Sequence, residues 1–211
     1  MAKNLVKTHF SKQEAISYGF KLAKENLFFF VVLFVIVMLV SGAMSVLSGL
    51  SAHEPAFAFV LWLLQMVVNL IIGIGIINIC LKFLDNQKPK YKDLFYYKPI
   101  VNYFLASLLE GLIVVGGFIL LIIPGIFFAL RLQFTSYLVV DKKLGPVEAI
   151  KTSWKITGGN AWNLFFFGIL LGLINILGVL CLLIGLFVTV PLSMLATTFV
   201  YRKLLLQSKA A

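Results

Sequence analysis

The stretch LFFFVVLFVIVMLV, residues 27–40, contains no polar or charged side chain. Residues of this kind contribute about −0.3 to −0.6 kcal/mol each to membrane insertion, so the stretch favours insertion by roughly 4–8 kcal/mol. The whole chain has the same character, because 61% of its 211 residues are hydrophobic, 12% are charged and the mean hydropathy is +1.03. A soluble domain carries about 25% charged residues. The sequence therefore predicts an all-α integral membrane protein.

Breaks in the apolar sequence divide it into six predicted transmembrane helices. The pair Pro124 and Gly125 indicates a tight turn between the third and fourth helices. Pro191 is expected to kink the sixth helix or to mark its outer end. The helices follow one another in pairs, which predicts three hairpins within a single membrane domain. The predicted spans are residues 27–47, 57–83, 100–123, 126–140, 161–182 and 186–206.

Lysine and arginine residues alternate with the predicted spans. They are concentrated before the first span, between the second and third, between the fourth and fifth, and after the sixth, and the other three connections contain none. Because positively charged loops stay in the cytoplasm, both termini are predicted on the cytoplasmic side of the cell (inner or cytoplasmic) membrane. The net charge of +10 then favours anionic lipid headgroups on that face as partners, and not nucleic acid.

Two polar segments of the chain resemble each other. GPVEAIKTSWKITGGN (145–160) precedes the fifth span, and SKQEAISYGFKLAKEN (11–26) precedes the first. Their apolar periodicity predicts cytoplasmic interfacial amphipathic helices over 146–158 and 11–25. An ordinary solvated loop helix is the alternative. The residues expected to contact lipid headgroups are Lys21, Lys24, Lys151, Lys155 and Trp154.

A weaker third segment, YKDLFYYKP (91–99), combines aromatic residues and lysines in a way that suits the headgroup zone. Each of the three predicted hairpins is then preceded by a surface segment.

The stretch 120–203 carries a recognisable pattern. It has a Pro-Gly pair, an Arg in the following helix, an acidic residue, a helix with Glu-Ala-Ile and Ser-Trp that closes with Gly, and a late Pro and Tyr. In this pattern the chain resembles the YciC-like family of six-helix bacterial membrane proteins and the membrane domain attached to some glycerophosphoryl diester phosphodiesterases. The resemblance implies an architecture, and no phosphodiesterase activity is expected. The matching residues are Pro124, Gly125, Arg131, Asp141, Glu148, Ala149, Ile150, Ser153, Trp154, Gly158, Pro191 and Tyr201.

Glu110 and Arg131 are the charged residues deep inside predicted spans. Each lies about 15 Å from the cytoplasmic end of its span at the rise of an α-helix. Charges at such depth usually face a partner or a cavity. We expect an ion pair across the hairpin; the alternatives are a functional polar cavity and side chains that reach out to the membrane surface.

The sequence contains no nucleophile elbow, metal-ligand cluster or phosphate-binding glycine loop. We therefore expect a non-enzymatic membrane module, with no catalytic residue, metal or cofactor, that organises lipid, a membrane-protein partner or a second copy of itself. The alternative is a small transporter or channel that uses a polar centre near Glu110 and Arg131.

Overall fold

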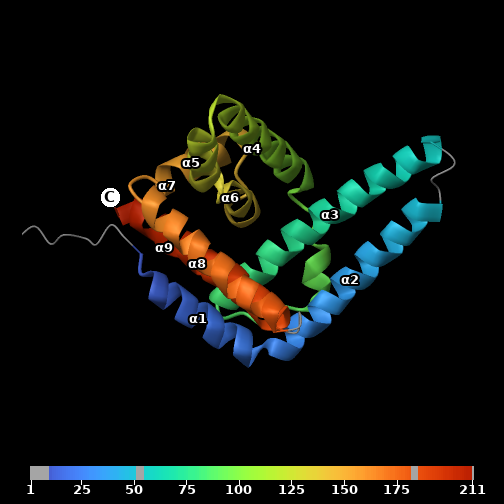
Figure 1. Cartoon of the computed structure of the whole chain (residues 1–211), viewed down its shortest axis with the longest axis horizontal. Coiled ribbons are helices and arrows are strands. Elements are labelled where there is room, and N and C mark those ends of the chain that lie inside the picture. Colours follow the sequence, from blue (N-terminus) through green and yellow to red (C-terminus); the bar gives the residue numbers. More distant parts are fainter. Residues whose placement is uncertain (1–9, 51–54, 182–184, 211) are drawn as a thin grey trace, which may run out of the picture.

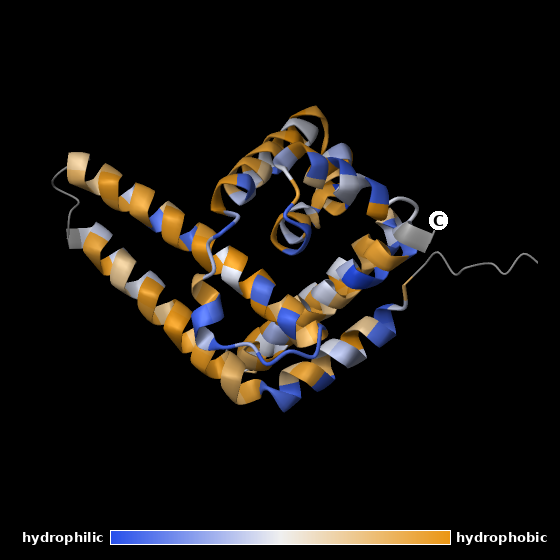
Figure 2. Ribbon diagram, turned by 180° about the vertical axis from the view of Figure 1, so that it is seen from behind, coloured by the Kyte–Doolittle hydropathy of each residue, from blue (hydrophilic) through white to orange (hydrophobic). Residues whose placement is uncertain are grey.

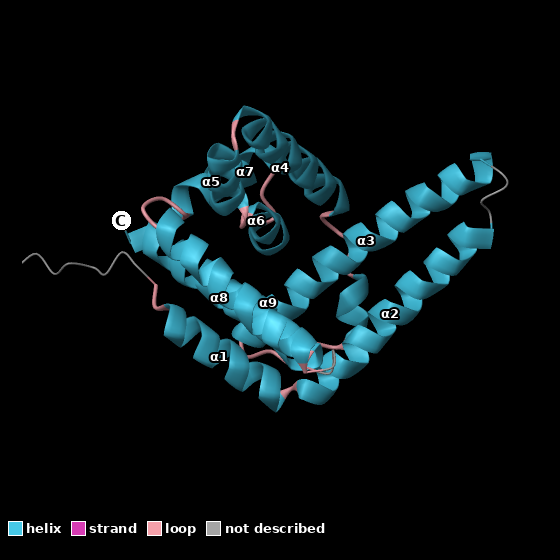
Figure 3. Ribbon diagram, in the orientation of Figure 1, coloured by secondary structure: helices cyan, strands magenta, loops and turns pink. Residues whose placement is uncertain are grey.

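The structure, a computed structural model, describes residues 10–50, 55–181 and 185–210. These residues form helices joined by loops, with no strand in the described ranges (Figure 3). The expected all-helical fold is confirmed. The helices are α1 (Lys12–Glu25), α2 (Leu27–Leu50), α3 (Pro55–Leu84), the 3-10 helix η1 (Tyr91–Phe95), α4 (Ile100–Leu120), α5 (Ile122–Leu132), α6 (Thr135–Lys142), α7 (Pro146–Ile156), α8 (Ala161–Leu180) and α9 (Leu186–Ala210).

Five stretches of the described chain are helical, long and apolar enough to cross a membrane, so the chain is a multi-pass membrane protein. The expected sixth span, 186–206, is not among them. Its helix α9 carries Arg202 and Lys203 and several hydroxyl side chains, which lower its hydropathy. The five stretches are Leu27–Gly49, Ala56–Leu84, Ile100–Leu120, Ile122–Lys142 and Ala161–Leu180.

Helix α9 is the centre of the molecule. It contacts α1, α2, α3, α7 and α8, and its residues Leu195, Ala196, Val200 and Tyr201 are fully buried. A helix that is covered by protein on most sides does not need the apolar surface that lipid requires. Its partly polar sequence therefore follows from its position.

The long helices run in two directions. The α2–α3 hairpin points away from the layer formed by α1, α8 and α9 (Figure 1). The residues of α2 and α3 are themselves hydrophobic over most of the length of both helices (Figure 2), as expected for helices that face lipid on most sides. The spans therefore do not form one bundle of parallel helices.

The surface segments that precede the hairpins pack in a cyclic order. We divide the chain into three repeat units: α1–α3, η1–α6 and α7–α9. Helix α1 packs mainly against α9 of the third unit, η1 against α3 of the first, and α7 against α4, α5 and α6 of the second. Each segment thus packs against a neighbouring unit: the first unit contacts the third, the second contacts the first, and the third contacts the second.

Small residues form the contact face of the repeated helix. Ala15, Gly19 and Ala23 of α1 are buried against the body. The equivalent positions of α7 are also buried, and they are Ala149, Ser153 and Thr157. Small residues let two helices approach closely, which is how helices associate where lipid removes the hydrophobic driving force. The repeat in the sequence therefore records a repeated packing face.

Residues that commonly cap helices lie at the ends of both repeated helices. Ser11 Oγ accepts a hydrogen bond from the Glu14 backbone N–H at 3.3 Å at the start of α1. Pro146 occupies the first turn of α7, and Gly159 beyond its end adopts a φ of +73°, which glycine adopts without strain.

The turn between α4 and α5 lies at Leu121, before the expected Pro-Gly pair. Leu121 is extended, and α5 begins at Ile122. Pro124 therefore falls in the first turn of a helix, where its missing N–H costs nothing. Gly125 instead allows close packing of the hairpin, because its Cα would lie 3.0 Å from a Cβ added at Gly117. Similarly, Pro191 lies inside α9, which continues past it.

The contact at Gly19 predicts a specific cost of adding a methyl group. A Cβ at Gly19 would lie 2.7 Å from the carbonyl oxygen of Leu192 and 3.0 Å from the Cβ of Ala196. We expect Gly19→Ala to lower the free energy of unfolding by about 1–3 kcal/mol, because α1 and α9 must move apart. Gly168→Ala in α8 is the matched control, since a Cβ there meets nothing within 4 Å. Unfolding curves in detergent micelles measure both, and equal stability of the two variants would contradict the close contact.

The attachment of η1 predicts a dependence on pH. Lys82 Nζ lies 2.8 Å from Asp93 Oδ1, and the Lys90 backbone N–H donates to Asp93 Oδ2 at 2.8 Å. Burial raises the pKa of Asp93, but these hydrogen bonds and the charges of Lys82 and Lys92 together bring the pKa below its ordinary value of 3.8. A lowered carboxyl pKa stabilises the fold above the unfolded pKa, and this stability is lost as the pH falls through the folded pKa. In the range below pH 3.8, we expect the thermal unfolding midpoint of the wild type to fall more steeply with decreasing pH than that of Asp93→Asn. Parallel midpoint curves would count against this contribution.

Candidate functional site

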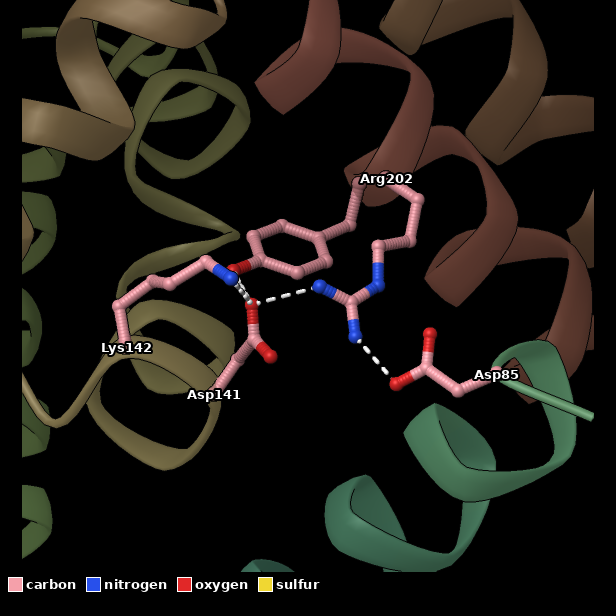
Figure 4. A network of polar contacts seen from close by, with 5 residues as sticks. Asp85, Asp141, Lys142 and Arg202 are labelled. Carbon is pink, nitrogen blue, oxygen red and sulfur yellow. Dashed lines mark hydrogen bonds and ion pairs between the residues drawn. The ribbon is translucent and has the colours of Figure 1, made fainter. Parts of the chain in front are cut away.

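An ionic cluster joins two helix ends to Arg202 of α9 (Figure 4). Its Nη1 lies 2.9 Å from Asp141 Oδ2, in the last turn of α6. Its Nη2 lies 2.7 Å from Asp85 Oδ2, directly after α3. One guanidinium group therefore holds the ends of α3 and α6 against α9.

Asp141 Oδ2 accepts two further contacts in this cluster. The hydroxyl of Tyr201 donates a hydrogen bond to it at 2.8 Å, and Lys142 Nζ lies 3.0 Å away. The side chain of Asp141 is 10% exposed and that of Asp85 is 45% exposed. With three donors on one oxygen of a nearly buried carboxylate, the cluster serves as an anchor between helices.

A second polar cluster surrounds Arg131 at the break between α5 and α6. The helix is interrupted at Gln133 and Phe134, which leaves the Arg131 carbonyl without its helical donor. The hydroxyls of Ser153 and Thr157 in α7 donate to this carbonyl at 2.9 and 3.1 Å. The break is therefore capped by α7.

The side chain of Arg131 also turns to α7. Its Nη2 donates to the Trp154 carbonyl at 2.7 Å, and its Cζ lies 4.4 Å from the centroid of the Trp154 ring. This cation–π contact and one short hydrogen bond tie the guanidinium to α7, while its buried Nε has no hydrogen-bond partner among the described residues.

The expected ion pair between Glu110 and Arg131 is not among the ion pairs of the described residues. Glu110 lies on α4 near Tyr103, whose hydroxyl contacts Ser136 of α6. The expectation relied on equal depth along the two helices. The backbone break next to Arg131 instead provides α7 as its partner.

The residues expected to meet lipid headgroups lie on the surface. Lys21 and Lys24 on α1 and Lys151 and Lys155 on α7 are exposed. Trp154 is 37% exposed, so one ring face contacts Arg131 while the side chain remains partly open.

Among the described residues, three shallow grooves beside these helices could not be predicted from the sequence. The largest, about 700 Å³, runs between α1 and α8 and includes Lys12. A groove of about 350 Å³ between α5 and α8 is lined by apolar residues such as Phe127 and Trp162. A smaller one of about 280 Å³ lies where Trp154 and Lys151 of α7 face α4 and α5.

Five of the twelve residues that carry the family resemblance lie in the two polar clusters. Arg131 contacts Ser153 and Trp154, and Asp141 contacts Tyr201. Both contacts join helices that are distant in the sequence. This part of the pattern is thus explained by packing between repeat units.

The ionic cluster predicts unequal effects of its two carboxylates. Asp141→Asn removes the carboxylate charge that pairs with Arg202 in the less exposed part of the cluster. We therefore expect a loss of about 2–4 kcal/mol in the free energy of unfolding. Asp85→Asn removes a largely solvated pair and should cost about 1 kcal/mol or less. Chemical unfolding of both variants in the same detergent measures the difference. Equal losses would show that Asp141 is not the main anchor.

Comparison with known proteins gives a family. The model of a domain of unknown function, DUF7847, matches residues 99–210, which include the stretch that resembles the YciC-like family. The chain is also 25% identical over 130 residues to the uncharacterized proteins Rv2560 of Mycobacterium tuberculosis and Mb2590 of Mycobacterium bovis. This match covers 62% of the chain and 40% of each relative, so the chain spans less than half of their length. No solved structure matches the chain. Since the family model covers more than half of its residues, the chain belongs to the DUF7847 family.

Proposed function

We propose that this chain is a non-enzymatic membrane module that organises anionic lipid at its cytoplasmic face. One observation carries the proposal. The repeated helices α1 and α7 are fixed to the body by buried small residues, while Lys21, Lys24, Lys151 and Lys155 remain exposed. A lysine close to an anionic membrane surface contributes about 1 kcal/mol of attraction.

The proposed topology has six membrane helices in three hairpins, with α7 as an interfacial helix and both termini in the cytoplasm. The expected interfacial position of α1 is not proposed, because α1 runs alongside the membrane helix α8. The support for this topology is the ionic cluster. Arg202 lies beside Asp85 and Asp141, and Lys203 pairs with Glu14 at 3.0 Å. The four lysine-rich segments therefore meet in space, as they must if they share one side of the membrane. A third hairpin that enters and returns without crossing fully would leave them on the same side.

A small transporter or channel is the alternative function. It would use a polar centre near Glu110 and Arg131, whereas the Arg131 guanidinium donates to the Trp154 carbonyl, an arrangement that favours the module. Irregular backbone at depth can line a cavity, but the break beside Arg131 is capped by Ser153 and Thr157.

The proposed function predicts selective retention of anionic lipid. We expect the full chain, extracted in native lipid discs, to be enriched in phosphatidylglycerol over the bulk membrane. Exchanging the four exposed lysines named above for Gln should reduce this enrichment by about fivefold or more. The same four exchanged for Arg are the matched control and should retain it. Mass spectrometry of the lipids in each disc gives the ratio, and a wild-type composition equal to that of the bulk membrane would overturn the proposal.

A further inference from the structure

We propose that the groove between α1 and α8 binds one anionic glycerophospholipid, with its phosphate at Lys12 and one acyl chain along the apolar floor. This inference rests on the proposed function, for which it names a ligand and a site.

The two helices run side by side in the same direction. Asn163 Nδ2 near the start of α8 donates to the Phe10 carbonyl at 3.0 Å, next to the start of α1, and the Phe10 and Phe167 rings meet edge to face at 5.6 Å. Helix α9 packs against both helices from behind. A groove between two parallel helices with a closed back is a continuous channel along the surface.

The groove is apolar along most of its length. Its floor and walls include Ile16 and Phe20 of α1 and Ile169, Leu170 and Leu173 of α8. The segment of α1 from Lys12 to Phe20 covers about 12 Å at helical rise. Phe20 is 47% exposed and Leu173 is 52% exposed. These side chains gain from burial by an apolar chain.

One end of the groove carries a cation. Lys12 Nζ lies 5.2 Å from the centroid of the Phe166 ring, which holds the ammonium group over α8. In the described residues no carboxylate forms an ion pair with Lys12. Gln13 and Ser17 add polar groups beside it.

This arrangement favours a single class of occupant. A cation at one end of an apolar channel complements a molecule with one anionic head and an extended apolar tail. The groove between α5 and α8 has apolar lining without a lysine, so it lacks the anchor for a headgroup. The groove beside α7 also includes a lysine, Lys151, but it measures only about 280 Å³ against about 700 Å³ for the α1–α8 groove. Charge complementarity and size together therefore distinguish the α1–α8 groove as the lipid site.

Native mass spectrometry of the full chain in mild detergent tests the site, with dioleoyl phosphatidylglycerol and dioleoyl phosphatidylcholine as probes. We expect Leu170→Trp to fill the groove and weaken retention of phosphatidylglycerol by about fivefold or more. Leu177→Trp, at an exposed position of α8 outside the groove, should behave as the wild type. Lys12→Gln should lower the preference for phosphatidylglycerol over phosphatidylcholine by about fivefold, and Lys88→Gln, at an exposed position between α3 and η1, should have a smaller effect. Equal effects within either pair would overturn the site.

A second measurement uses the unmodified chain, so it does not depend on whether a variant folds. Phosphatidylglycerol with a photoreactive diazirine in the acyl chain should label peptides from α1 and α8 above those from α2 and α3. Even labelling of all four helices would overturn the inference. The two proposals fail separately: if the α1 and α7 lysines control lipid retention but the groove variants do not, the module still organises lipid and the groove does not bind it. If the wild type retains no excess anionic lipid, the proposed function fails as well.

Discussion

The two ion pairs of Arg202 hold the three repeat units in fixed positions relative to one another. One guanidinium group contacts Asp85 after α3 and Asp141 in α6, and these carboxylates belong to different repeat units from α9. The planar group presents its donors in fixed directions, so each carboxylate must approach along its own line. The interaction therefore constrains where the ends of α3 and α6 lie relative to α9, although its net contribution to stability is modest where Asp85 is solvated. Arg202 and the buried Tyr201 beside it both reach Asp141, so α9 contacts the end of α6 through two side chains.

Close approach of backbones provides the stability that burial of apolar surface cannot provide inside lipid. Lipid tails are as apolar as leucine, so helices associate through packing and hydrogen bonds. Gly19 on α1, Gly75 on α3 and Gly117 on α4 each lie where an added Cβ would collide with another segment. At Gly75 that segment is the backbone of Leu94 in η1. The attachment of α1, the attachment of η1 and the α4–α5 hairpin thus each depend on a glycine at the point of contact.

Much of the fold could be predicted from local sequence. Apolar length placed five of the expected spans, because the cost of exposing polar backbone to lipid leaves helices as the available structure. The repeated segment was recognised as a helix from its periodicity, Pro146 and the glycines after it. Its buried face could not be assigned, because periodicity does not say which element covers a helix. The position of Leu121 as the turn was also hidden, since an extended leucine has no sequence signature, whereas Pro124 suits both a turn and a first helical turn.

The contacts between segments distant in the sequence could not be predicted either, because they depend on which helices pack together. Equal depth along two neighbouring helices suggested that Arg131 would pair with Glu110. The actual partner depends on a helix break at Gln133 and Phe134, where a free carbonyl attracts the hydroxyls of α7 and brings Trp154 to the guanidinium. The grooves were equally invisible, because each is lined by two elements that are brought together only by the cyclic packing of the units.

That packing gives the grooves a common origin. The α1–α8 groove lies between the third and first units, and the other two described above lie between the second and third. Equivalent faces of the repeated helices take part, since Ile16 and Phe20 in one groove correspond to Ile150 and Trp154 in another. The boundary between two of these units is covered by a short pre-hairpin helix, α1 or α7, and a groove lies beside it. Surface hollows therefore remain at the boundaries, next to helices that carry the exposed lysines. In a membrane such hollows are filled by lipid chains, so an architecture of interlocked repeat units places apolar grooves and cationic side chains together without a dedicated binding domain.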